Sequence, residues 1–161
     1  MIKGKIHKFG ANIDTDAIIP SRYANLTDPA ALGQHCMEGV APEFYQQVRP
    51  GDIIMGTTNF GCGSSREVAP ISIKGAGVAC VVAKTFARIF FRNAINIALP
   101  LLECAEAVDH TEPGDEVQID LSSGAIRNIT KHREFTAAAY PDFLRGIIDA
   151  GGLIKYTQTR W

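Results

Sequence analysis

One stretch of the sequence restricts the possible folds more than any other. Residues 77–83, Gly-Val-Ala-Cys-Val-Val-Ala, form a continuous apolar run between a polar segment and Lys84. A strand with one solvated face alternates apolar and polar residues, whereas an unbroken short apolar run is typical of a strand buried on both faces. The run therefore predicts an inner strand of a parallel sheet.

The segments around this run repeat the order strand, helix, strand, helix, strand. Strands are expected at 53–55 and 97–102, and helices at 71–76 and 86–95, the second with Thr85 as its cap. This order predicts a right-handed parallel unit, so the expected fold class is α/β with a mainly parallel central sheet.

The flanking segments predict a smaller set of elements. A first strand is expected near the N-terminus and a β-hairpin after the parallel unit, because both stretches alternate in polarity. The last helix is expected to stop at Gly151 and Gly152. The predicted ranges are 2–9 for the strand, 117–121 and 125–129 for the hairpin, and 30–37, 43–48 and 137–150 for helices, with Asp28 and Pro29 opening the first of them.

Composition and charge indicate one globular domain over residues 1–161. Hydrophobic residues make up 46% and charged residues 20%, and the formal net charge is −1. This near-neutral balance gives no electrostatic basis for binding nucleic acid or an anionic membrane. No segment has the length of a signal peptide's apolar region or of a bilayer span, so we expect a cytoplasmic protein.

The four cysteines indicate no metal site. Cys36, Cys62, Cys80 and Cys104 are too scattered for zinc or iron–sulfur spacing, and the four histidines share no metal-ligand spacing. Cys80 and Cys104 lie in or beside apolar runs, as core residues do. Cys62 lies in a turn and is either a reactive thiol or a buried bystander.

The turn with the most chemical information is Asn-Phe-Gly-Cys-Gly-Ser-Ser-Arg-Glu-Val-Ala-Pro, residues 59–70. Gly61 and Gly63 allow positive φ and close approach of a ligand, and Ser64 and Ser65 are expected to cap the following helix. Free amides and the Arg66 guanidinium favour a carboxylate. The alternative is an ordinary tight turn. The turn lacks the third glycine of a dinucleotide-binding motif and the Gly-Lys-Ser/Thr sequence of a P-loop. Both of these phosphate-binding assignments are therefore weakened.

Two further segments carry polar groups. Asp14 and Asp16 lie in a turn at 12–16 and are either solvated or hold an arginine in place. The loop at 20–27 contains Arg22 and Tyr23 and is either informative about a ligand or a plain surface loop. For Arg88 and Arg92, four apart on one helix face, a solvated face or pairing with the two aspartates is favoured over substrate contact.

Three motifs together resemble the aconitase superfamily, and specifically the small subunits of 3-isopropylmalate dehydratase and its relatives. The motifs are Asn-Ile-Asp-Thr-Asp-Ala-Ile-Ile-Pro at 12–20, the turn at 59–70, and Thr-Phe-Ala-Arg-Ile-Phe-Phe-Arg-Asn at 85–93. The resemblance implies a three-layer β/β/α swivel domain. It also implies a separate large subunit that holds a [4Fe-4S] cluster by three cysteines, with no cofactor bound by this chain and no activity of this chain alone.

The resemblance further implies roles for individual residues. Ser64 is similar to the general base that removes a proton next to a substrate carboxylate, with its pKa lowered by helix-end amides, Arg66 and the iron. Ser65, Arg66 and Arg22 are expected to bind the substrate, which is a small dicarboxylate or tricarboxylate. Asp14 and Asp16 are expected to orient the site. Many relatives have histidine where this chain has Val68, so no histidine at that position is essential here.

Substrate choice is expected to depend on the loop residues Tyr23, Ala24, Asn25 and Leu26. Ala24 and Leu26 suit an alkyl group, and Asn25 supplies no charge for an additional carboxylate, which favours a branched alkyl malate. The expected reaction is interconversion of 2- and 3-isopropylmalate in leucine biosynthesis. The alternatives are the small subunit of 2,3-dimethylmalate dehydratase or homoaconitase, a non-catalytic dicarboxylate-binding module, and a protein that only docks on a cluster protein.

Overall fold

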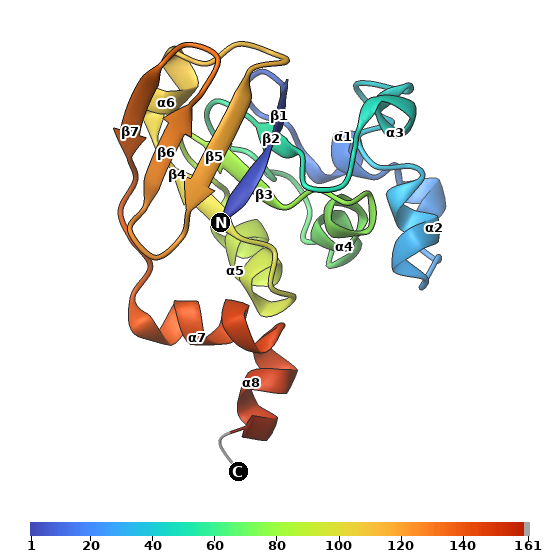
Figure 1. Ribbon diagram of the computed structural model, residues 1–161. Coiled ribbons are helices and arrows are strands. Elements are labelled where there is room, and N and C mark those ends of the chain that lie inside the picture. Colours follow the sequence, from blue (N-terminus) through green and yellow to red (C-terminus); the bar gives the residue numbers. More distant parts are fainter. Residues whose placement is uncertain (160–161) are drawn as a thin grey trace.

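The computed structural model describes residues 1–159 and contains a seven-stranded sheet in the order β4-β3-β2-β1-β5-β6-β7 (Figure 1). One half is parallel and the other is antiparallel, and β1 belongs to both because its residues 2–5 pair with β5 and 6–8 with β2. The strands are β1 Ile2–Lys8, β2 Ile53–Met55, β3 Cys80–Ala83, β4 Leu101–Glu103, β5 Glu116–Asp120, β6 Ala125–Asn128 and β7 Arg133–Thr136.

The parallel half has a different core on each face. Successive strand residues point to opposite faces, so Val81 and Ala83 of β3 enter one cluster and Cys80 and Val82 the other. The first cluster faces helices; the second faces the antiparallel half, where it includes Val117 and residues of β6 and β7. The sheet therefore curls over itself and gives the expected three layers, β/β/α.

Helices surround this sheet on three sides. Figure 1 shows α1 to α4 on the right of the view, α6 behind the antiparallel strands, and α7 and α8 below α5. The helices are α1 Thr15–Ile18, a 3-10 turn η1 Ser21–Tyr23, α2 Pro29–Gly33, α3 Phe44–Gln47, α4 Val68–Gly75, α5 Arg88–Asn96, α6 Ala105–Asp109, α7 Asp142–Ala150 and α8 Leu153–Thr159.

Two glycines allow α2 and α4 to cross with their backbones in contact. A Cβ on Gly33 would overlap the backbone of Gly75, and a Cβ on Gly75 would overlap the carbonyl of Pro29. No larger residue fits this crossing without separating the helices. The crossing fixes α2, and with it the loop at 20–27 that precedes α2, against α4. Helix α4 follows the turn at residues 59–70, called the Ser-Ser-Arg turn below after Ser64, Ser65 and Arg66.

Two helices were expected to start beside or pack against the turn at 59–70, and both expected starting residues were wrong. Helix α4 begins at Val68 with Glu67 as its N-cap and no side-chain capping bond, so neither Ser64 nor Ser65 caps it. Helix α5 begins at Arg88 rather than 86, because the Thr85 hydroxyl accepts a hydrogen bond from Asn59 N at 2.7 Å instead of capping the helix. In both cases contacts distant in sequence outweigh the local capping preference.

Several other elements differ from the expected ranges. The strand expected at 97–102 starts at Leu101, because residues 97–99 turn back on the end of α5 and Ala98 has φ of 64°. The helix expected at 30–37 ends at Gly33, and Met37, with φ of 60°, donates its N–H to Ile18 instead. The last helix starts at 142. Helices α1, α6 and α8 and strand β7 were not predicted, whereas the hairpin and the Gly151 stop are confirmed.

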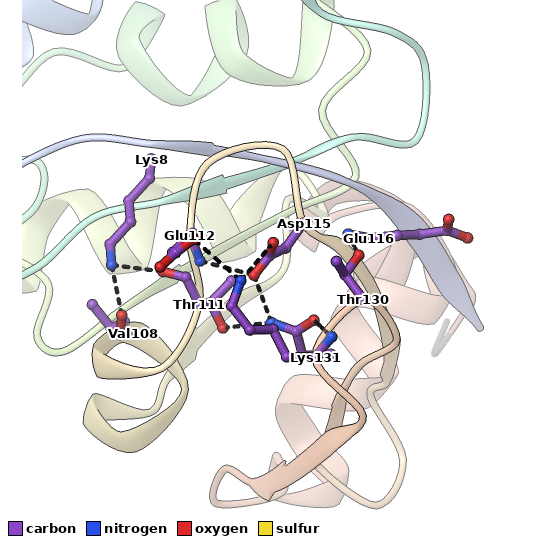
Figure 2. Close-up of polar contacts among 9 residues, drawn as sticks. Lys8, Val108, Thr111, Glu112, Asp115, Glu116, Thr130 and Lys131 are labelled. Atoms are coloured by element: carbon purple, nitrogen blue, oxygen red, sulfur yellow. Dashed lines mark hydrogen bonds and ion pairs between the residues drawn. The ribbon is translucent and has the colours of Figure 1, made fainter.

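A polar network joins the two halves of the sheet at the start of β5 (Figure 2). Lys8 Nζ donates to the carbonyls of Val108 and Thr111, at 2.7 Å each. The buried Asp115 carboxylate accepts hydrogen bonds from Glu112 N and Asn128 Nδ2, at 2.9 Å each, and lies 3.2 Å from Lys131 Nζ. Because every partner is a backbone group or a satisfied side chain, this network stabilises the fold and leaves no free ligand group.

Candidate functional site

The Ser-Ser-Arg turn is held between two other segments of the chain. Gly61 N donates to the Ile13 carbonyl at 2.7 Å, and Thr15 N donates to the Cys62 carbonyl at 2.9 Å. On the other side Phe60 forms an isolated parallel bridge with Phe86. The three motifs at 12–20, 59–70 and 85–93, far apart in sequence, therefore meet at one place.

Both glycines of this turn have the positive φ that the sequence predicts. Gly61 has φ of 86° and Gly63 has φ of 90°. A Cβ on Gly61 would also overlap the ring of Phe90, whereas a Cβ on Gly63 would lie 3.4 Å from the Asp14 Cβ. The first glycine is thus required by both conformation and space, and the second by conformation alone.

Ser64 and Ser65 are exposed, and their hydroxyls make no hydrogen bond within residues 1–159. The backbone is nevertheless fixed, since the Thr15 hydroxyl donates to the Ser64 carbonyl at 2.8 Å. Because α4 begins at Val68 with Glu67 as its N-cap, Ser64 lies three residues before the N-cap of that helix. The two hydroxyls are free to meet a ligand.

Asp14 and Asp16 take different parts in the site. Asp14 is the N-cap of α1 and accepts from Ala17 N at 2.7 Å. Asp16 Oδ1 lies 3.4 Å from Arg66 Nη1 and accepts from Ser21 N at 3.1 Å. An acid in this turn does hold an arginine, and the arginine is Arg66. Within the described residues neither Arg88 nor Arg92 pairs with either aspartate, and both are exposed, so of the two favoured alternatives the solvated face is confirmed.

A cavity of about 200 Å³ opens beside Ser65 and Arg66, whereas Ser64, Asp14 and Asp16 are not among the residues that line it. It is lined by Ser65 and Arg66 and by the first turns of α5, which contribute Arg88 and Asn93. The Arg88 side chain is exposed and makes no ion pair or hydrogen bond within residues 1–159, so it is a second guanidinium available to an anion. The remaining lining residues are Thr15, Gly61, Gly63, Ala87, Ile89 and Phe90.

From the sequence, substrate contact by Arg88 ranked below a solvated face, and Asn93 was not singled out as a candidate site residue. The one signal for them was the position of the third motif, whose first turn carries Arg88. A second, larger hollow of about 920 Å³ lies along β1 between Lys3 and Phe9. It contains no residue of the Ser-Ser-Arg turn, and the cavity beside Arg66 is therefore the candidate site.

The loop at 20–27 is connected to this site through Asp16, which accepts from Ser21 N and lies 3.4 Å from Arg66, although no loop residue lines the cavity. It begins with the 3-10 turn Ser21–Tyr23, and Ala24 and Asn25 are exposed while Leu26 packs partly against the helical core. Arg22 is not free, because its Nη2 lies 2.9 Å from Glu38 Oε1. The loop thus exposes the small or uncharged residues Ala24 and Asn25 together with Arg22, whose side chain is paired with Glu38.

The cysteines behave as structural residues. Burial raises the pKa of both Cys36 and Cys80 to about 12, so these thiols stay protonated at neutral pH. Cys104 is buried, and Cys62 is half-buried in the turn. Within residues 1–159 no three His, Cys, Asp or Glu side chains are grouped to hold a metal ion, so these residues do not fit an iron–sulfur cluster.

No helix within residues 1–159 combines the length and apolar character needed to span a bilayer.

Comparison with known proteins gives one consistent result. Residues 11–107 match the family model of the aconitase C-terminal domain. The chain is 58% identical to a 3-isopropylmalate dehydratase small subunit of Caldicellulosiruptor saccharolyticus, covering 98% of this chain and 91% of that one. It is 55% identical to a 2,3-dimethylmalate dehydratase small subunit of Eubacterium barkeri, covering 96% and 94%.

A solved structure agrees with the sequence relatives. The crystal structure of a 3-isopropylmalate dehydratase from Methanocaldococcus jannaschii superposes with a TM-score of 0.92 at 46% identity, covering 99% of this chain and 94% of that one. Identities of this size over nearly the whole chain show common descent as well as a common fold. The chain therefore belongs to the aconitase C-terminal domain family and, within it, to the small subunits of 3-isopropylmalate dehydratase and its close relatives.

Proposed function

We propose that this chain is the small subunit of a hydro-lyase that interconverts 2- and 3-isopropylmalate in leucine biosynthesis. The observation that carries the proposal is the exposed Ser64–Ser65 pair beside Arg66, on a turn fixed by all three motifs. The relatives named as small subunits of this enzyme support the assignment. The chain acts as one swivel domain that completes a site on a large subunit.

The reaction exchanges a hydroxyl and a hydrogen between neighbouring carbons. A proton leaves the carbon next to a carboxylate, hydroxide leaves the adjacent carbon, and a double bond forms, so that the proton and the hydroxide together make up one molecule of water. Water then adds in the opposite sense. Ser64 is the proposed base that takes this proton. A serine hydroxyl is a weak base in water, so its action requires stabilisation of the negative oxygen, to which the guanidinium of Arg66 contributes.

The other residues bind and orient the substrate. Ser65 and Arg66 hold one carboxylate, since both line the cavity and a guanidinium fits a carboxylate with two hydrogen bonds. Arg88 is placed to meet the second carboxylate of the malate skeleton. Asp16 orients Arg66, and Asp14 orients the helix that carries Asp16. Arg22 is paired with Glu38 and is not among the residues that line the cavity.

The large subunit is the proposed holder of the [4Fe-4S] cluster, in keeping with the similarity of this chain to the small subunits of the enzyme. Free cysteines, three of them buried, fit a reducing compartment, and we place the complex in the cytoplasm. The uncharged outer residues Ala24 and Asn25 favour an alkyl side group over a third carboxylate. The 55% identical dimethylmalate relative makes 2,3-dimethylmalate the second candidate substrate.

The test is turnover by the chain reconstituted anaerobically with its cluster-bearing large subunit. Isopropylmalate, 2,3-dimethylmalate and homocitrate are offered separately, and kcat/KM is measured for each. We expect isopropylmalate to give the highest value. A preference for dimethylmalate or homocitrate would keep the reaction type and reject the substrate. Absence of turnover with all three, in an assembled complex, would leave the non-catalytic binding module as the better account.

A further inference from the structure

A carboxylate outside the three motifs holds the loop that borders the site. Glu38 Oε1 accepts hydrogen bonds from Arg22 Nη2 at 2.9 Å and from the Tyr23 hydroxyl at 2.8 Å, and Glu38 Oε2 lies 2.7 Å from His35 Nδ1. One side chain therefore fixes two consecutive loop residues. The Glu38 side chain is 22% exposed and the Arg22 side chain is 66% exposed, so water screens the charge pair with Arg22 more than the contacts on the Glu38 side.

Ring contacts restrict the same loop further. The rings of Tyr23 and His35 stack with centroids 3.7 Å apart and planes 9° apart. The guanidinium carbon of Arg22 lies 4.8 Å from the centre of the Tyr23 ring. Tyr23 is thus held at its hydroxyl and across its ring, and Arg22 is directed at Glu38 rather than at the cavity.

Glu38 is itself anchored to the helix that carries the site aspartates. Its neighbours donate backbone hydrogen bonds to α1, Met37 N to Ile18 O at 2.6 Å and Gly39 N to Ala17 O at 3.1 Å. A Cβ on Gly39 would lie only 2.6 Å from the Ala17 Cα, so the two segments are in backbone contact. The position of Glu38 relative to Asp16 and Arg66 is therefore set by the backbone.

Glu38 remains a carboxylate at neutral pH. Partial burial alone would raise its pKa, but hydrogen bonds from His35, Tyr23 and Arg22 outweigh burial and lower the pKa below its usual value. The Arg22 guanidinium of the loop is therefore paired with a charged carboxylate. A substrate side group ending in a carboxylate would meet an arginine already paired and a fixed negative charge behind it.

We propose that Glu38 is a specificity-determining residue of this site, which excludes substrates with a charged side group by holding Arg22 and Tyr23 away from it. The inference rests on the proposed hydro-lyase function and extends it to a residue that touches no substrate. An alkyl side group is unaffected by the paired charges, whereas a carboxylate loses a binding partner and gains a repulsive one.

The test is Glu38→Gln in the reconstituted complex. Glutamine has nearly the same shape and can still accept from Tyr23, but it carries no charge to hold Arg22. The measured quantity is the ratio of kcat/KM for homocitrate to kcat/KM for isopropylmalate. We expect this ratio to rise by about 1.4- to fivefold, the size of effect that exposed charge pairs produce. Glu38→Asp, which keeps the charge, should stay closer to the wild-type ratio.

Two controls separate specificity from stability. Glu134→Gln removes a carboxylate from an exposed pair with Arg127 on the antiparallel half and should leave the ratio unchanged. The double variant E38Q/R22Q should lose the rise, because the released arginine is its source. An unchanged ratio in a folded E38Q complex would overturn the proposal, and a rise that persists in the double variant would overturn the role of Arg22. Turnover of isopropylmalate by the wild-type complex tests the proposed hydro-lyase function separately. An inactive wild-type complex would overturn both that function and the role of Glu38.

Discussion

At the scale of single residues, the site depends on positions where only glycine fits. Gly61 and Gly63 both have φ near 90°, where a side chain costs about 1–2 kcal/mol. They differ in space, because a Cβ on Gly61 meets the Phe90 ring and a Cβ on Gly63 does not meet any atom closer than 3.4 Å. The same backbone conformation is therefore expected to have two different mutational costs.

We expect Gly63→Ala to lower the free energy of unfolding by about 1–2 kcal/mol, and Gly61→Ala by about 2–5 kcal/mol, since overpacking adds to the strain. Denaturant unfolding of the isolated chain measures both. Both variants should also lower turnover in the complex, because they displace Ser64 and Ser65. Equal costs for the two alanines would show that the Phe90 ring moves aside and that the close packing is not required.

At the scale of elements, the start of β2 is joined to β1 by one buried carboxylate. Asp52 accepts hydrogen bonds from Lys5 N at 3.1 Å and Arg49 N at 3.0 Å, and its Oδ2 lies 2.7 Å from His7 Nε2. Burial acts to raise the pKa of Asp52, but these hydrogen bonds outweigh it and the pKa is lowered. The ionised form thus stabilises the parallel half of the sheet.

We expect Asp52→Asn to lower the free energy of unfolding by about 1–3 kcal/mol at neutral pH. Because the folded pKa lies below the unfolded value of about 3.9, the stabilisation is present above that value and is lost as the pH falls through the folded pKa. The difference between wild type and variant should therefore shrink below about pH 4. Urea titrations at pH 7 and pH 3 measure it, with Glu134→Gln as the exposed control, and a constant difference would refute the linkage.

Elements also show what could and could not be predicted from sequence. The buried run around β3 and the glycines of the turn were predictable, because a two-sided apolar strand and a positive φ each leave a local signature. The start of α4 was not, since the Thr15 hydroxyl that holds Ser64 comes from 49 residues away. The same holds for Glu38, whose contacts with Arg22 cross 16 residues. Strand β7 starts with Arg-Glu and carries little apolar pattern of its own.

At the scale of the whole molecule, this chain supplies one side of a reaction site. Ser64 and Ser65 are exposed, and the cavity of about 200 Å³ is small for a substrate with two carboxylates and an alkyl group. The net charge of −1 leaves the positive field local to Arg66 and Arg88. A partner surface is needed to enclose the substrate and exclude water, so we expect the chain alone to show no turnover of isopropylmalate at any concentration.

The most direct test of the account is kcat of the reconstituted complex with Ser64→Ala. Loss of a general base typically costs about 10²–10⁴ in rate, so we predict a fall of that size with unchanged assembly with the large subunit. Ser123→Ala, at an exposed serine in the turn between β5 and β6, is the matched control and should keep wild-type kcat. An assembled S64A complex that keeps its kcat would contradict the assignment of Ser64 as the base.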